Sequence, residues 1–593
     1  MNSLLLIACT LVIYFFGYRY FARFLHRKVF RLPVAAKNPS TPGSSIAKRI
    51  QNASSVRHEM LGFHFAAITS LTAVSGASVA VFWGWVPAYL WLLIGSSVAA
   101  GTFAIGSLWL RRQNTESQND AIIGTGLIPV ISETFHRRLS PALLVLLVVA
   151  LILFSGLFVY FAAILLVSFP AATWPTLVTL LVVGLLSRVL ANQNITLGER
   201  LPSYLVGIVV VLLSIWITRG KTLGFSGSLN FDLSGQSLFS IDGIAVWGVL
   251  ILLFSLFVQR KPFDDWQKTL GTLTAVATIV LMVLFYIGVV IRHPAMSAPT
   301  LTGASSPGIL PWLFITLSSG AYAGLHFLFA YSVTGPRLNH DEDVTYIGYG
   351  ATLLQGLVGL SVIVVFGALL GNREVWLSLY QSWPALPDGS AMLGHYVNGV
   401  IFAGSQLGIS NEFMETFTAL VLTSLSLVSA ISLLRVLRVL LQELGGRYKL
   451  ERLGRMKTAS WAGFFLVFVA VLATNASTNI KVLEQLLGAT QYLLASIGLL
   501  LIVAAMNRNK LMVMPAWILF GVTVVIGLVA DAALIFSWYR HFQPTAFLAG
   551  ILLLTIQLAL LGDTANTLWK RRTPPTQPSP PPAPSTPENP DSP

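Results

Sequence analysis

Stretches of about twenty consecutive apolar residues recur along the whole chain and constrain its fold more than any other feature. An α-helix of that length spans the hydrocarbon core of a bilayer. By this rule the sequence predicts fifteen spans, near residues 3–18, 62–81, 86–109, 142–167, 174–191, 203–218, 243–258, 270–291, 309–331, 346–370, 412–434, 459–474, 485–506, 512–536 and 544–562. The apolar piece 396–410 is short and holds Asn398, Ser405 and Gln406, so we interpret it as a re-entrant or surface segment. The predicted fold class is an all-α polytopic membrane protein.

Composition and charge agree with this class. The chain is 55% hydrophobic and only 10% charged, whereas an ordinary soluble domain is about a quarter charged. Its net charge of +14 would suggest nucleic acid for a soluble protein, but here the positive-inside rule accounts for it. With the N-terminus outside and alternating spans, most of the 37 Lys and Arg residues lie in the cytoplasm. The exceptions are Arg219, Lys221, Arg292, Arg373, Lys481 and Arg540. We therefore expect a cytoplasmic C-terminus and a lipid bilayer, not nucleic acid, around the chain.

No soluble domain interrupts the spans. The longest loops, 19–60 and 219–243, are too short to bury a sizeable core, and the tail 570–593 is basic and then proline-rich, as in disordered segments. The single cysteine, Cys9, excludes an intramolecular disulfide. The sequence has no phosphate-binding loop, no H-E-x-x-H motif and no G-x-S-x-G motif. We expect no enzyme activity, cofactor or metal.

Two histidines lie within predicted spans, where an ionisable group usually faces a cavity or a partner helix. His64 begins the second span and His326 lies near the end of the ninth. The predicted topology places both within about two turns of the cytoplasmic boundary at 1.5 Å per residue, so we expect similar depths. Histidine titrates near physiological pH, which suits a proton-coupled gate. The alternative is that the two rings are hydrogen-bonded separately within the bundle.

Small and hydroxyl residues follow His64 and precede His326. Such residues let a helix unwind while its freed backbone finds partners, and broken helices build the sites of secondary transporters. A close-packing face is the alternative. The residues concerned are Thr69, Ser70, Thr72, Ser75, Gly76 and Ser78 in one span, and Ser318, Ser319, Gly320 and Gly324 in the other.

Aromatic and charged residues near span ends are weaker candidates for function. Trp83 and Trp85 stand where the chain should leave the membrane, as interfacial anchors do. Asp531 lies near the outer end of its span, where a solvated helix end is the simpler interpretation. The same holds for Glu412 and Glu415.

Six short stretches carry a family resemblance when they are read in order. They are IYFFGYRYFARFL near the start, LGFHFAAI at 61–68, PWLFITLSSGAYAGLHFL at 311–328, VTGPR at 333–337, YIGYG at 346–350 and LRVLRVLLQELGG at 434–446. Over residues 10–450 this order resembles the carbon starvation protein CstA family of bacterial membrane transporters. The matched residues are Gly62, His64, Phe65, Ala66, Ala67, His326, Pro336, Gly348, Tyr349, Gly350, Arg435 and Arg438.

The resemblance implies import of a peptide or pyruvate across the inner membrane during carbon limitation, with protons. It implies a fold similar to the amino acid/polyamine/organocation superfamily, with five-helix inverted repeats. It also divides the chain into a transporter core at 1–450, additional transmembrane helices at 451–569 and the tail at 570–593.

The chain departs from the family pattern at positions that bear on proton coupling. Phe63 stands where the family has a first histidine, and Thr69 to Thr72 replace its A-G-A-G-P run. Gln355 occupies the place of a glutamate, and Ile431 the place of an aspartate. Losing intramembrane acids weakens proton coupling more than transport, because coupling requires a titrating group whereas binding can use neutral hydrogen bonds.

The hypothesis from sequence is therefore a secondary transporter of a peptide or pyruvate-like carboxylate in the bacterial inner membrane. The alternative is a non-transporting membrane sensor or scaffold derived from a transporter fold. The candidate pathway residues are His64, Thr69, Ser70, Thr72, Ser75, Gly76, Ser318, Ser319, Gly320, His326, Tyr349 and Gln355.

Overall fold

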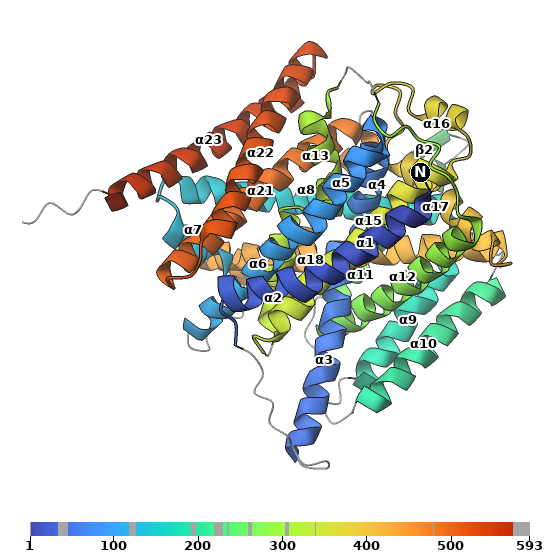
Figure 1. Ribbon diagram of the computed structural model, residues 1–593, viewed down its shortest axis with the longest axis horizontal. Coiled ribbons are helices and arrows are strands. Elements are labelled where there is room, and N and C mark those ends of the chain that lie inside the picture. Colours follow the sequence, from blue (N-terminus) through green and yellow to red (C-terminus); the bar gives the residue numbers. More distant parts are fainter. Residues whose placement is uncertain are drawn as a thin grey trace, which may run out of the picture.

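The computed structural model shows a bundle of long helices with one short β-hairpin (Figure 1). It describes residues 2–33, 45–117, 126–190, 197–218, 229–233, 236–258, 264–302, 307–338, 340–477 and 480–572. The proline-rich part of the predicted tail, 573–593, lies outside the described residues.

The elements follow the apolar segments of the sequence. The first part comprises α1 (Ser3–Phe16), α2 (Ala22–Phe24), α3 (Ser45–Ile68), α4 (Leu71–Ala80), α5 (Trp85–Ile94), α6 (Gly101–Ser117), α7 (Leu127–Thr134), α8 (Leu139–Ser168), α9 (Thr173–Leu190) and α10 (Leu197–Thr218). The middle comprises β1 (Leu229–Leu233), β2 (Gln236–Ile241), α11 (Gly243–Val258), α12 (Asp264–Arg292), α13 (Ile309–Ala321), α14 (Leu325–Leu328), α15 (Asp343–Val364), α16 (Arg373–Leu379) and α17 (Gly389–Ser405). The last part comprises α18 (Asn411–Arg447), α19 (Glu451–Gly454), α20 (Met456–Ala476), α21 (Ile480–Arg508), α22 (Met514–Arg540) and α23 (Pro544–Arg572).

The structure confirms a multi-pass helical membrane protein but not fifteen full-length spans. In the described part of the chain, 11 helices are long and apolar enough to cross a bilayer, or up to 12 if the bent pair Val56–Ile68 and Leu71–Trp83 is one span. The remaining predicted spans coincide with the shorter apolar helices Pro202–Thr218, Gly243–Val258 and Ile309–Ser318. Hydropathy therefore located the segments, but it did not show that some of them are short or interrupted.

Two predicted non-helical regions contain regular structure. The loop predicted at 19–60 is helical as far as Val29 and again from Ser45, because hydropathy marks the apolar window and not the polar continuation of a helix. The piece 396–410 includes the second half of α17, which packs against α4, α12 and α18 and buries Tyr396, Val397 and Val400.

The centre of the bundle is formed by α18 and α21. The apolar window of α18 is 100% buried and that of α21 is 94% buried, whereas the window containing α1 is only 22% buried. α8 packs along α18, and α22 and α23 lie together at one edge of the bundle, opposite α9 and α10 (Figure 1). The two most buried windows thus lie after residue 410, and the windows Trp85–Asn114 and Asp343–Leu369, each 78% buried, also belong to the interior.

The ends of the helices define two sides of the molecule. We call one the hairpin side, because it carries β1 and β2; Asp242 there accepts a hydrogen bond from Asn475 at 3.0 Å, just before α21 begins. We call the other the arginine side, because Arg57, Arg112 and Arg337 lie there. α12 runs between them, from Gln267 near Arg337 to a segment that pairs with Asn2.

Two helices approach each other closely near the centre of the hairpin side. A Cβ on Gly76 of α4 would lie 1.9 Å from the carbonyl oxygen of Thr316 in α13. Similarly, a Cβ on Gly324 would lie 2.4 Å from the carbonyl oxygen of Gln491 in α21. The small residues of these segments therefore form a packing face, as one of the two interpretations of the sequence proposed.

We expect Gly76→Ala to destabilise the protein, because α4 and α13 must separate to accommodate the methyl group. Overpacking of this kind costs about 1–3 kcal/mol. Gly521→Ala is the matched control, since a Cβ there meets nothing within 4 Å and alanine favours the helix by about 1 kcal/mol. Thermal unfolding in detergent should show a lower Tm for Gly76→Ala only; equal Tm values would contradict the packing.

Candidate functional site

The second predicted span is a broken helix. α3 and α4 meet at a bend of 52°, and Ser70 between them is extended, with φ −75° and ψ 162°. The hydroxyls of Ser70 and Thr72 are hydrogen-bonded to each other at 2.6 Å. Thr69 is buried, and its Oγ1 has no hydrogen-bond partner among the residues that the structure describes. The prediction that this stretch unwinds is therefore confirmed.

Side chains from two other helices bind the backbone freed at this break. Gln355 of α15 donates from Nε2 to the carbonyl oxygen of Ile68 at 3.4 Å. Ser429 of α18 donates to the carbonyl oxygen of Ala67 at 2.9 Å. Backbone groups at membrane depth need such partners because no bulk water reaches them. Gln355 and Ser429 thus support the break of α3.

The second break separates α13 from α14. Tyr322 ends α13 in an extended conformation, with φ −153° and ψ 119°. At the start of α14, the N–H of Leu325 donates to Oε1 of Gln491 at 2.9 Å. The hydroxyl of Tyr322 is hydrogen-bonded to Thr523 of α22 at 3.1 Å. Gln355 of α15 therefore stabilises the first break, and Gln491 of α21 stabilises the second.

A pocket lies beside the breaks, toward the hairpin side. Its walls come from α4, α8, α13, α21 and the segment before α17. Four of the predicted pathway residues line it, namely Thr72, Ser75, Gly76 and Ser318. α13 also carries Ser319 and Gly320, whose side chains lie outside the described part of the structure.

The two histidines are buried but do not line this pocket. His64 is hydrogen-bonded through Nδ1 to Oγ1 of Thr334 at 2.8 Å. His326 lies in the first turn of α14, and neither ring nitrogen has a hydrogen-bond partner among the described residues. The two rings interact electrostatically. A buried polar group without a partner is unusual and often functional, so His326 is the stronger candidate. Their equal depth stays a prediction.

Tyr349 lies apart from the pocket. Its ring approaches Tyr18 and Phe21 of the N-terminal helix, with centroids 6.2 Å and 6.3 Å apart. A Cβ on Gly101 would lie 2.4 Å from this ring. Tyr349 therefore packs the N-terminal helix against α6 and does not line this pocket.

An aromatic cluster lies at the mouth of the pocket. Trp383 lines the pocket, and its ring centroid lies 5.3 Å from that of Trp83 and 5.4 Å from that of Trp312. Trp83 also donates to the carbonyl oxygen of Pro307 at 2.8 Å. The prediction that Trp83 and Trp85 are interfacial anchors is wrong, because both are buried within the protein, at 0% and 3% exposure.

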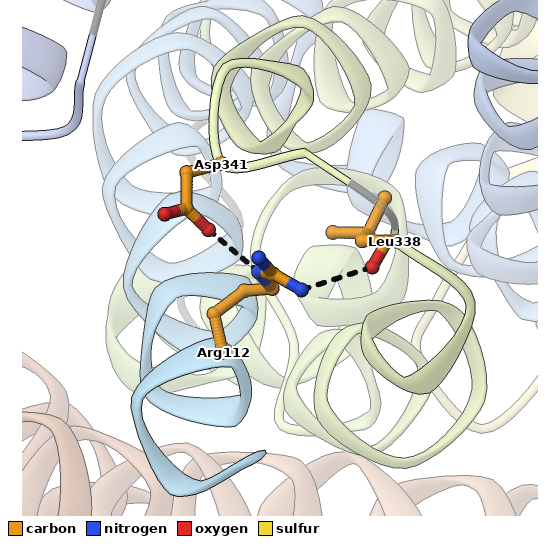
Figure 2. Close-up of polar contacts among 3 residues, drawn as sticks. All are labelled: Arg112, Leu338 and Asp341. Atoms are coloured by element: carbon orange, nitrogen blue, oxygen red, sulfur yellow. Dashed lines mark hydrogen bonds and ion pairs between the residues drawn. The ribbon is translucent and has the colours of Figure 1, made fainter. Parts of the chain in front are cut away.

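The arginine side is closed by polar contacts. Figure 2 shows the side chain of Arg112 reaching from α6 to Asp341 and to the carbonyl oxygen of Leu338. The Arg112 Nε to Asp341 Oδ1 distance is 2.5 Å. Arg57 of α3 pairs with Asp343 at 3.4 Å. These contacts fix the chain that follows α14 to α6 and α3.

A second group of contacts extends the closure across the bundle. Gln267 of α12 accepts hydrogen bonds through Oε1 from Arg337 at 3.0 Å and from Arg435 at 3.3 Å. Its Nε2 donates to Ser432 of α18 at 2.8 Å. Arg435, one of the residues that carry the family resemblance, takes part in this network.

Several residues of the site were not predicted from sequence. Lys481, Glu484 and Gln491 of α21 line the pocket. The predicted span began at 485, which placed Lys481 and Glu484 in a loop, and Gln491 within that span was the available signal. α21 and α22 belong to the segment 451–569, interpreted as additional helices, yet they support the second break. The domain division at residue 450 stays a prediction.

The fold and pocket define a multi-pass membrane protein with two broken helices beside a pocket that combines apolar walls with hydroxyl, amide and charged side chains. Residues 2–379 match the family model described as carbon starvation protein CstA. The chain therefore belongs to this family, as the sequence resemblance predicted. The pocket residues of α21 lie beyond the matched segment.

Curated relatives carry transporter names. The peptide transporter CstA of Mycobacterium tuberculosis is 24% identical over 422 residues, which is 68% of this chain and 51% of the relative. The pyruvate/proton symporter BtsT of Escherichia coli is 24% identical over 384 residues, 61% of this chain and 49% of the relative. The chain thus spans about half the length of these relatives. The peptide transporter CstA of Bacillus subtilis is 22% identical, with 84% of this chain and 85% of the relative covered.

A solved structure of the manganese transporter of Eremococcus coleocola is also similar. It is 13% identical, with a TM-score of 0.48, and the alignment covers 91% of this chain and 100% of that chain.

We expect Gln491→Leu to destabilise the second break, because the N–H of Leu325 would lose its partner inside the membrane. Leaving a buried donor unsatisfied costs about 1–3 kcal/mol. Gln406→Leu is the control, since Gln406 is partly exposed and its side chain bonds to Phe402 and Ser405 of its own helix end. Thermal unfolding in detergent compares the two variants. An unchanged Tm in Gln491→Leu would show that the hydrogen bond from Leu325 to Gln491 does not stabilise the protein.

The ion pair of Arg112 and Asp341 should hold the arginine side closed. Removing a partly buried, charge-assisted contact costs about 1–3 kcal/mol, so Asp341→Asn should raise amide exchange in residues 325–345 at least about fivefold. Hydrogen–deuterium exchange measures this directly. Arg508→Gln, which changes an exposed residue on the same side, should leave the exchange unaltered. Unaltered exchange in Asp341→Asn as well would contradict the claim that this ion pair holds the arginine side closed.

Proposed function

We propose that the chain is a secondary transporter that carries a peptide or a pyruvate-like carboxylate across the bacterial inner membrane. One observation supports this most: a pocket that carries hydroxyl, amide and charged side chains lies between two broken helices, and the ion pair of Arg112 and Asp341 lies on the arginine side of the molecule. Alternating access requires such a pocket together with contacts that can close either side. The names of the curated relatives supply the substrate classes.

The orientation that we propose places the arginine side in the cytoplasm. The positive-inside rule supports it, because Arg57, Arg112, Arg337 and Arg435 all lie on that side. The N-terminus, which pairs with Ala295 after α12, is then outside. The pocket would accept substrate from outside in the state that the structure represents.

The hydroxyl side chains on the pocket wall suit a small polar substrate. Thr72, Ser75 and Ser318 offer neutral hydrogen bonds, and Lys481 supplies a cation near the mouth. The N-terminal end of α4 also faces the first break, and helix N-termini attract anionic groups. This combination favours a substrate that carries a carboxylate.

Uptake into proteoliposomes tests the proposal. Labelled pyruvate and a labelled alanine dipeptide should enter, and an inward proton gradient should increase the entry of at least one of them. His326→Ala should lower the uptake by about tenfold or more if His326 borders the pathway, because an unpartnered buried imidazole would be lost. Val522→Trp, at an exposed position on α22, is the control for surface changes. Saturable binding without flux would instead support a sensor or scaffold.

A further inference from the structure

Glu484 is the carboxylate on the wall of the pocket. It lies near the start of α21 and, together with Gly488 and Gln491, lines the same cavity. Residues at these spacings share one face of an α-helix. That face therefore runs from the pocket mouth at Glu484 to the brace of the second break at Gln491.

The neighbours of Glu484 act on its charge in opposite directions. The backbone N–H of Gly389, at the start of α17, points at the carboxylate, and Lys481 lies nearby on the same helix. Both favour the anion, since a helix N-terminus and a cation attract negative charge. Asp388, the N-cap of α17, is a second negative charge close by. The Oε1 atom of Glu484 is buried without a hydrogen-bond partner among the described residues.

The other pocket walls add no further charge at this position. α8 contributes the apolar side chains of Phe154 and Leu157. α4 and α13 contribute only hydroxyl, glycine and aliphatic residues to the lining. Lys481 donates to the carbonyl oxygen of Pro384 at 3.1 Å. The charge of the pocket mouth therefore depends on Lys481, Asp388 and the protonation of Glu484.

We propose that Glu484 takes up the coupled proton in this transporter, in the role that Gln355 and Ile431 cannot fill. The inference rests on the proposed transport function. With the pocket open to the hairpin side, the carboxylate accepts a proton from water and becomes neutral. One negative charge is then removed beside Lys481, so the pocket binds a substrate carboxylate more strongly. After the pocket opens to the arginine side, the proton and the substrate leave to that side.

This coupling is reciprocal: if protonation strengthens substrate binding, then substrate binding also favours protonation. Carboxylate binding should therefore strengthen as the pH falls. The acid is supplied by α21, beyond the segment 2–379 that matches the family model.

The test compares Glu484→Gln with Glu484→Asp in proteoliposomes, using labelled pyruvate and a labelled alanine dipeptide. At one proton per substrate, a gradient of one pH unit supports about tenfold accumulation in the unaltered protein. In Glu484→Gln we expect no accumulation, so that the substrate reaches about equal concentrations on the two sides of the membrane. Counterflow should become independent of pH. Glu484→Asp should retain a pH-dependent counterflow. Glu412→Gln, at an exposed helix end, is the matched control.

Three outcomes would overturn the proposal. Gradient-driven accumulation in Glu484→Gln would show that another group carries the proton. A pH profile of counterflow that Glu484→Gln leaves unchanged would also show that another group carries the proton. Loss of counterflow in both Glu484→Gln and Glu484→Asp, with Tm values equal to that of the unaltered protein, would show that the side chain is needed for binding alone. Absence of flux in the unaltered protein would refute the transport function itself. That outcome is therefore distinguishable from a failure of the proposal about Glu484.

Discussion

A helix that is interrupted inside a bilayer leaves backbone N–H and C=O groups that must find partners within the protein. In this chain those partners are side chains from neighbouring helices: Gln355 and Ser429 for the end of α3, and Gln491 for the start of α14. The pocket exists because the breaks are stable, and the breaks are stable because α15, α18 and α21 support them. Close packing of α4 on α13 then fixes their separation.

The polar contacts are distributed unevenly between the two sides. On the arginine side, Arg112 and Arg57 hold the chain after α14 to α6 and α3, and Gln267 connects α12 to α18. On the hairpin side, aromatic rings around Trp383 and the Lys481 to Pro384 contact surround an open pocket. This asymmetry is what a transporter has when one gate is closed and the other is accessible. Rearrangement of both sets would expose the same pocket to the other side.

Much of the fold could be predicted from the sequence, because apolar length is a direct physical requirement of the bilayer. The break after His64 was also predictable, since hydroxyl and small residues interrupt an apolar run there. The long-range contacts could not be predicted: nothing local to Gln355 or Gln491 indicates that their amides bind a backbone far away in the chain. Lys481 and Glu484 were missed because they lie at a span end, where charge is normally explained by the interface. Trp83 was misinterpreted for the same reason, since sequence does not show whether a tryptophan at a span end faces lipid or protein.

The central claim is that the pocket between the breaks is the substrate pathway and is open only to the hairpin side. Thiol accessibility tests it most directly. In a Cys9→Ser background, which removes the single exposed cysteine, cysteines would replace Thr72 and Thr316 of the pocket wall. A small membrane-impermeant thiol reagent would be applied from each side of oriented vesicles. The account predicts labelling from the hairpin side, with protection by a transported substrate. Labelling from the arginine side alone, or labelling that no substrate of the protein reduces, would contradict it.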